Sequence, residues 1–140
     1  MFARGVTLLE MLVVLLVAGI LAALALPAYR QHMVRVNRSQ ATTLLYEIAS
    51  AQERHYLRHG NYSSDLSAGG ALGLGLAAVN TSTHYSFSVS LAGDAQTYIA
   101  SATPRRGGGQ DADGECLVFS IDQRGRRAVS GTRGTAFCWR

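Results

Sequence analysis

The 140-residue chain contains no lysine, so all 13 of its basic residues other than histidine are arginines. A complete absence of lysine usually reflects the base composition of the genome, so it excludes no class of function. The chain also has only two cysteines, Cys116 and Cys138, which allow a single disulfide pairing. With a net charge of only +4, the positions of the arginines are more informative than their number.

Catalytic and cofactor-binding motifs are also missing. His55 and His59 lie four residues apart, but no His-Glu-x-x-His zinc motif contains them. No serine or cysteine has the neighbours typical of a nucleophile. The glycines of residues 69–75 have no Gly-Lys-Ser/Thr after them, as a phosphate-binding loop requires. We therefore predict no enzyme activity, no cofactor, and solvent-exposed side chains for the four histidines, His32, His55, His59 and His84.

The apolar residues, 48% of the chain, are concentrated in one run from Val6 to Leu26. A helix of this length measures about 31 Å and crosses the hydrocarbon core of a bilayer. A secretory signal would end in an A-x-A-like site; none stands directly before Pro27, and cleavage near Ala25 is the less favoured alternative. Arg4 on the N-terminal flank favours a cytoplasmic N-terminus. The sequence thus predicts a single membrane span, with the following residues on the outer side.

This orientation decides how the two cysteines are interpreted. On the oxidising side Cys116 and Cys138 would form a disulfide that closes a loop of about 20 residues and contributes about 3 kcal/mol. In a cytosolic chain the same cysteines would stay reduced.

Glu10 is an acid near the start of the apolar run. A carboxylate inside a membrane span is costly, so it indicates a function and requires a partner. The alternative is that Glu10 lies at the level of the lipid headgroups.

The N-terminus resembles the processing site of type IV prepilins and pseudopilins. The resemblance is carried by Arg4-Gly5, by the segment from Val6 to Met11 with its acid at Glu10, and by Gly19 and Pro27. It implies a leader over residues 1–5, which a prepilin peptidase removes after Gly5 before it methylates the new amine of Val6. The family usually has phenylalanine at that first mature position, so Val6 is a departure.

The resemblance also gives Glu10 a partner. In the family this acid is thought to meet the N-terminal amine of a neighbouring subunit, and a mispaired register would leave a buried charge unpaired. Glu10 would therefore set the register of assembly. Gly19 and Pro27 would weaken the helix over residues 6–27, the segment that spans the membrane and then forms the filament core.

Beyond Pro27 the pattern predicts an α+β head over residues 28–140. Apolar residues at helical spacing continue to His59, and Gly60 is a helix stop signal. We therefore predict one helix from Val6 to His59, whose apolar N-terminal half protrudes from the head. Residues 61–83 read as a loop with a possible short helix over 72–79. Alternation then predicts an antiparallel sheet of three or four strands that packs on the helix, over residues 85–91, 96–103, 117–121 and 127–130.

Two clusters in the head are candidate binding sites. The disulfide loop 116–138 holds four arginines against one acid, Asp122, which is the pattern of a surface for the DNA backbone. These residues are Arg124, Arg126, Arg127 and Arg133. The alternative is a solvated turn, or arginines that pair with acids of neighbouring subunits. Asp111, Asp113 and Glu115 are a weak calcium candidate, because they fall far short of a full calcium loop.

Taken with its head, the chain resembles the minor pilins of the PilE and ComP group, of which ComP-type members act as DNA receptors. The first hypothesis is a minor type IV pilus subunit. It would be held in the inner membrane with its head in the periplasm, and would reach the extracellular pilus with other pilins and the assembly machinery as partners. The second is a DNA receptor for natural transformation, and the third a type II secretion pseudopilin. An unrelated signal-anchored periplasmic enzyme is the remaining alternative.

Overall fold

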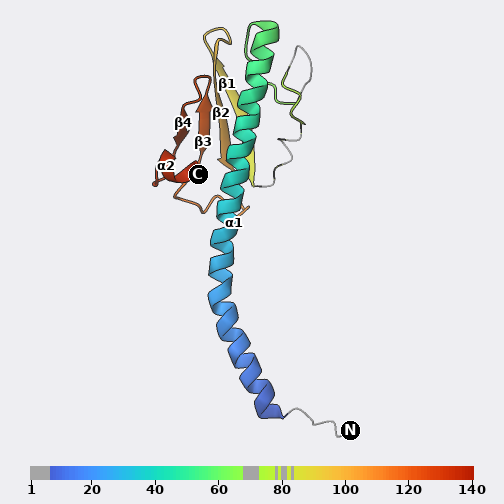
Figure 1. Cartoon of the computed structure of the whole chain (residues 1–140), viewed down its shortest axis with the longest axis vertical. Coiled ribbons are helices and arrows are strands. Elements are labelled where there is room, and N and C mark those ends of the chain that lie inside the picture. The colour runs from blue at the N-terminus through green and yellow to red at the C-terminus, as the bar shows by residue number, and fades with distance from the viewer. Residues whose placement is uncertain (1–6, 68–72, 78, 80–81, 83) are drawn as a thin grey trace. The chain divides into compact units, whose positions relative to one another are not determined.

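The computed structural model describes residues 7–67, 73–77, 79, 82 and 84–140. It divides into two compact units, residues 1–33 and 34–140, which are considered separately. Helix α1, Leu8–His59, contributes to both (Figure 1). The predicted start of this helix at Val6 lies outside the described residues, and its predicted end at His59 is confirmed.

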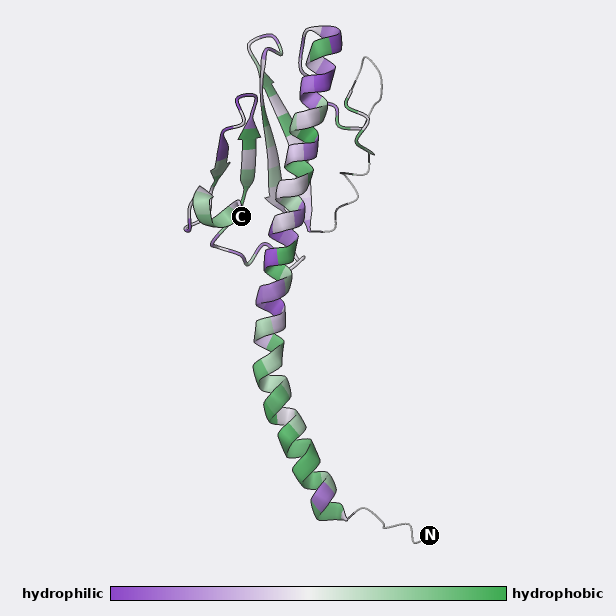
Figure 2. Cartoon of the chain, in the orientation of Figure 1, coloured by the Kyte–Doolittle hydropathy of each residue, from purple (hydrophilic) through white to green (hydrophobic). Residues whose placement is uncertain are grey.

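In the first unit, Thr7 caps α1. The backbone N–H of Glu10 donates to Thr7 Oγ1 at 3.2 Å, which satisfies one of the free amides of the first turn. Every residue from Thr7 to His32 is exposed, and Figure 2 shows that most of this stretch is apolar. By length and composition α1 can cross a membrane. Exposure of so many leucines and valines to water is unfavourable, which indicates a lipid or protein environment for this segment.

The two predicted weak points do not interrupt the helix. Gly19 and Pro27 both lie within continuous α-helix. Pro27 has no N–H to donate to the carbonyl of Ala23, so one helical hydrogen bond is missing there. A methyl group on Gly19 would meet nothing within 4 Å, so its packing within this unit does not require a glycine.

The second unit contains a four-stranded antiparallel sheet with strand order β1-β2-β3-β4 (Figure 1). Its elements are β1 Tyr85–Ala92, β2 Thr97–Pro104, β3 Phe119–Asp122, β4 Arg127–Val129 and a final short helix, α2 Thr135–Cys138. The predicted strands are confirmed to within two residues at each end. The sequence analysis missed α2, which is only four residues long.

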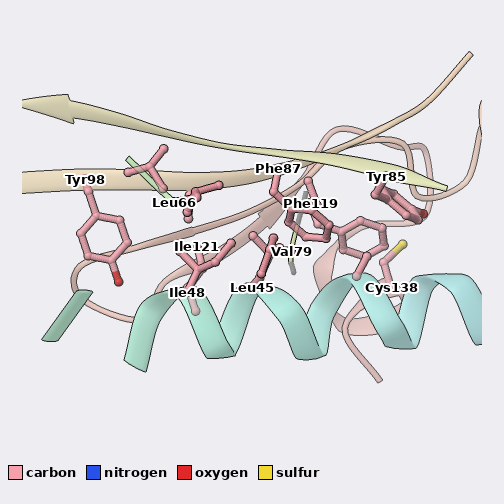
Figure 3. Close-up of a cluster of buried hydrophobic side chains, with 14 of the residues drawn as sticks. Leu45, Ile48, Leu66, Val79, Tyr85, Phe87, Tyr98, Phe119, Ile121 and Cys138 are labelled. Atoms are coloured by element: carbon pink, nitrogen blue, oxygen red, sulfur yellow. The ribbon is translucent and has the colours of Figure 1, made fainter. Parts of the chain in front are cut away.

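The core lies between the C-terminal half of α1 and one face of the sheet. Leu45 and Ile48 of α1 are fully buried against Phe119 and Ile121 of β3, as Figure 3 shows. On β1, Phe87 and Val89 alternate with exposed serines, which is the period of two that predicted the strand. The α+β class and the packing of a helix on the sheet are therefore confirmed.

The loop between α1 and β1 differs from one expectation. Gly60 ends α1 with a φ of +73° and donates its N–H to the carbonyl of Tyr56 at 2.8 Å, as its stop signal predicted. Residues 73–77 and 79 contain no α-helix, although residues 77 and 79 adopt a 3₁₀ conformation. The rest of the helix proposed for residues 72–79 lies outside the described residues.

Candidate functional site

A disulfide joins Cys116 and Cys138, which confirms the pairing predicted from the sequence. Both cysteines are buried in the core, with their Cα atoms 5.8 Å apart. The bridge fixes α2 beside the start of β3. The chain between the two cysteines therefore forms a closed loop that carries β3, β4 and the predicted arginines.

The β3–β4 turn is organised by Asp122, the last residue of β3. Asp122 Oδ1 accepts the backbone N–H groups of Arg124 and Arg126, each at 2.9 Å. Gly125 adopts a φ of +70°, which a residue with a side chain rarely tolerates. These contacts explain why the sequence Gln123-Arg124-Gly125 forms a turn. The preceding acid, Asp122, and the glycine within the turn define its tight geometry, and the arginines extend from it.

Arg127, at the start of β4, is held by aromatic side chains. Its Nη1 donates to the hydroxyl of Tyr46 on α1 at 3.2 Å, and its guanidinium lies 6.0 Å from the centre of the Trp139 ring. Tyr46 and Trp139 meet edge to face at 5.6 Å. This contact holds the guanidinium in a preferred position at an exposed surface without neutralising it.

The structure separates Arg133 from the other three predicted arginines. Arg124, Arg126 and Arg127 cluster at the β3–β4 turn, whereas Arg133 follows β4 at its opposite end, next to α2 (Figure 1). Arg133 Nε lies 3.4 Å from Glu115, and its guanidinium lies 4.7 Å from the ring centre of Phe137. The predicted basic edge is therefore a turn with three arginines and one acid, Asp122.

Two of the three calcium candidates, Asp113 and Glu115, are held by arginine instead. Arg38 on α1 is buried and binds both carboxylate oxygens of Asp113, at 2.6 and 2.5 Å, and one of Glu115 at 3.0 Å. Asp111 accepts the backbone N–H of Gly107 at 2.9 Å. Among the described residues no group of three or more His, Cys, Asp or Glu side chains is placed to hold a metal ion. The arrangement gives the calcium hypothesis no support, since Arg38 takes the position of the cation.

These contacts shift the ionisation of the carboxyl groups. The hydrogen bond from Arg38, helped by Arg133, lowers the pKa of Glu115. Partial burial works to raise the pKa of Asp122, but the hydrogen bonds from Arg126 and Arg124 outweigh it and lower the pKa below its usual range. Both groups are therefore negatively charged at neutral pH, and the turn keeps a local excess of positive charge.

Two of the four histidines, His55 and His84, differ from the expectation of exposure. His55 is buried, and its Nδ1 is 2.9 Å from the carbonyl oxygen of Asn61, so Nδ1 carries the proton and donates it. It is covered because α1 turns this face toward the segment after Gly60. His32 and His59 are exposed as predicted, and His84 is half-buried.

The N-terminal assembly residues are only partly described. Glu10 is exposed in the first turn of α1, where an acid also interacts favourably with the positive end of the helix dipole. Gly5 and Val6, the predicted cleavage and methylation residues, lie outside the described residues.

Two protein-family models match the chain. The prokaryotic N-terminal methylation motif matches residues 1–26. A model described as type IV minor pilin ComP, DNA uptake sequence receptor, matches residues 27–120. Together the two matches cover the apolar segment of α1 and most of the head, up to the first residues of β3.

The chain is also similar to individual proteins. It is 40% identical over 67 residues to a type IV major pilin protein PilE of Neisseria gonorrhoeae, and 37% identical over 67 residues to the fimbrial protein EcpC of Eikenella corrodens. These matches cover 48% of this chain but only 40% and 44% of those proteins. The chain thus aligns with less than half the length of these curated relatives.

Solved structures have the same fold. A type IV pilin from Shewanella oneidensis aligns with a TM-score of 0.53 and 26% identity, over 73% of this chain and 98% of that one. The Neisseria meningitidis non-core minor pilin PilV aligns with a TM-score of 0.53 and 22% identity, over 74% of this chain and 93% of that one.

Proposed function

Because the chain belongs to the type IV minor pilin family described as ComP, DNA uptake sequence receptor, we propose that it is a pilus subunit whose β3–β4 turn binds DNA. The observation that carries the DNA part is the cluster of Arg124, Arg126 and Arg127 at one turn, stabilised by Asp122 and by the aromatic side chains beside it. Arginine is suited to phosphate because its planar fork donates two hydrogen bonds at once.

The assembly part of the proposal is based on the N-terminus. Residues 1–5 are the leader, a prepilin peptidase cleaves after Gly5, and the amine of Val6 is methylated, as the match to the N-terminal methylation motif supports. Residues 6–27 anchor the subunit in the inner membrane with the head, residues 28–140, in the periplasm. The assembly machinery then moves this segment into the core of an extracellular pilus, where it packs among other pilins.

Glu10 sets the register of this packing by pairing with the amine of a neighbouring subunit. The exposure of Glu10 and of the whole apolar stretch to His32 supports a role outside the head. Glu10→Ala is expected to be processed normally but to enter pili poorly, as measured by immunoblots of membranes and of sheared pili. Gly5→Asp, in contrast, is expected to block cleavage. Normal incorporation of Glu10→Ala would refute the register role.

The DNA part is tested by fluorescence anisotropy with a short labelled DNA duplex and the full-length chain in detergent, across a series of salt concentrations. We expect binding that weakens with salt, because each phosphate contact releases counterions. Arg124→Gln/Arg127→Gln should reduce the slope of log affinity against log salt by about 1.8, for two lost contacts. The matched control, Arg58→Gln/Arg106→Gln, removes the same charge from exposed sites outside the turn. Equal loss in both double variants would refute a site at the turn.

Each relative and structure given above is a pilin or a fimbrial protein, and none favours a type II secretion pseudopilin. The family is structural, which also leaves the periplasmic enzyme without support.

A further inference from the structure

The three arginines of the β3–β4 turn are not equivalent. Arg126 folds back on its own turn, and its Nε donates to Asp122 Oδ2 at 2.7 Å. The Arg126 side chain is 71% exposed, whereas the Asp122 side chain is only 13% exposed and also accepts two backbone N–H groups. The acid is thus fixed in the turn, and the arginine is the mobile partner of the pair.

The other two arginines have no acidic partner among the residues that the structure describes. Within the described part of the chain, the exposed side chain of Arg124 makes no hydrogen bond or ion pair. Among the same described residues, the guanidinium of Arg127 contacts the Tyr46 hydroxyl and the Trp139 ring, which are both uncharged. Both guanidinium groups keep their full charge and their capacity to bind an anion.

We propose that Asp122 is a positioning residue of the DNA-binding turn, which keeps Arg126 away from DNA and leaves Arg124 and Arg127 as the phosphate contacts. The inference rests on the proposed function, since it assumes that this turn meets DNA. It changes the expectation from the sequence, in which Arg126 counted equally with its neighbours.

The reason is that Asp122 already balances the charge of Arg126. Only the Nε–H of Arg126 is donated to Asp122, so its Nη groups could still reach a phosphate. A phosphate at that point would also lie beside the Asp122 carboxylate, and the repulsion between these two negative charges would cancel most of the attraction to Arg126. Asp122 cannot turn away, because its Oδ1 holds the backbone N–H groups of Arg124 and Arg126. Arg126 therefore neutralises Asp122 in both the free and the bound state.

The key variant is Asp122→Asn. The asparagine amide oxygen still accepts both backbone N–H groups, so the turn is kept, while its amide nitrogen cannot accept from Arg126. Arg126 is then released and becomes a third phosphate contact. We expect binding to tighten about fivefold, as for an exposed pair of charges, and the salt slope to steepen by about 0.9.

The experiment compares four full-length chains in detergent by anisotropy with the same DNA duplex and salt series: wild type, Asp122→Asn, Arg126→Gln, and the double variant. Arg126→Gln should weaken binding without changing the slope, because it removes no phosphate contact but leaves the carboxylate exposed. The double variant, with a neutral pair, should return close to the wild-type affinity and slope.

The opposite pattern would overturn the proposal. If Arg126 contacts phosphate in the wild type, Arg126→Gln will lower the slope by about 0.9, and Asp122→Asn will leave the slope unchanged. Loss of DNA binding by the wild type itself would instead refute the proposed function. Thermal melting checks each variant, and Asp122→Ser, whose hydroxyl also accepts backbone N–H groups, replaces Asp122→Asn if that chain does not fold.

Discussion

Gly131 lies where the chain after β4 crosses the segment that leads into Cys116 of the disulfide. A methyl group added at Gly131 would overlap the carbonyl oxygen and carbon of Glu115 and the amide nitrogen of Cys116. These are main-chain atoms next to a buried disulfide, so they cannot move aside as the end of a side chain would. In Gly131→Ala the crossing segment must therefore lift away from Glu115.

The cost of this movement follows from the hydrogen bonds that hold the crossing. Thr132 N–H donates to the carbonyl of Gly114, and Arg133 N–H donates to that of Glu115, both at 3.1 Å. Each such bond contributes about 1 kcal/mol. We expect Gly131→Ala, which disturbs both bonds, to lower the free energy of unfolding by about 2 kcal/mol. The disulfide still forms, because Cys116 and Cys138 are held by the core on either side.

Urea unfolding followed by circular dichroism measures this loss, and hydrogen exchange of the Thr132 and Arg133 amides locates it. Gly114→Ala is the matched control, since a methyl group at Gly114 meets nothing within 4 Å and its φ is not in the left-handed region. The control should lie within about 0.5 kcal/mol of the wild type. If Gly131→Ala is as stable as the wild type and both amides are still protected from exchange, a methyl group at this position does not force the two segments apart, and the prediction is refuted.

Three further predictions concern stability of the head. Arg38→Leu leaves the buried carboxylate of Asp113 without its charged partner and should lower the free energy of unfolding in urea by about 3–5 kcal/mol. The double variant Arg38→Leu/Asp113→Asn, which also removes the charge of Asp113, should recover part of this loss. The pKa of Glu115 is lowered in the folded state, so its ionised carboxylate stabilises the head fully above the unfolded pKa, and this stabilisation is lost as the pH falls below about 4. The melting temperature of Glu115→Gln should therefore vary less with pH over that range than the melting temperature of the wild type. Ala95 has a φ of +62°, a strained value for a residue with a side chain, so Ala95→Gly should raise stability by up to about 1 kcal/mol in thermal melts, whereas a drop would mean that contacts of the methyl group outweigh the strain.

Sequence reasoning recovered the secondary structure because the patterns in this chain are strong. The alternation of Phe87 and Val89 with serines fixes one face of β1, and Gly60 stands where α1 ends. The short helix α2 was missed for a physical reason: four residues from Thr135 to Cys138 are too few to show a helical period. It forms because the disulfide and the packing of Trp139 on Phe119 hold the chain end against the core.

Tertiary contacts explain what the sequence could not predict. The partner of Asp113 is Arg38, 75 residues earlier on α1, and no local pattern joins the two. His55 lies seven residues after Ile48 and four after Ala51, so the helical period places it on the buried face of α1, a signal that the sequence analysis overlooked. The carbonyl of Asn61, just after Gly60, accepts its hydrogen bond.

The arginine set shows most clearly how a charge pattern differs from a charged surface. Between the two cysteines the sequence places four arginines against one acid, and counting along the chain treats them alike. In the folded head, Glu115 takes up Arg133, Asp122 takes up Arg126, and two uncharged aromatic side chains orient Arg127. The acid that matters most for Arg133 lies outside the disulfide loop, so only the fold brings it there. Within the described part of the chain, a stretch that appears uniformly basic is therefore reduced to two arginines without an acidic partner, Arg124 and Arg127. The effects of single-arginine variants are then expected to follow the partner of each arginine and not its position in the sequence.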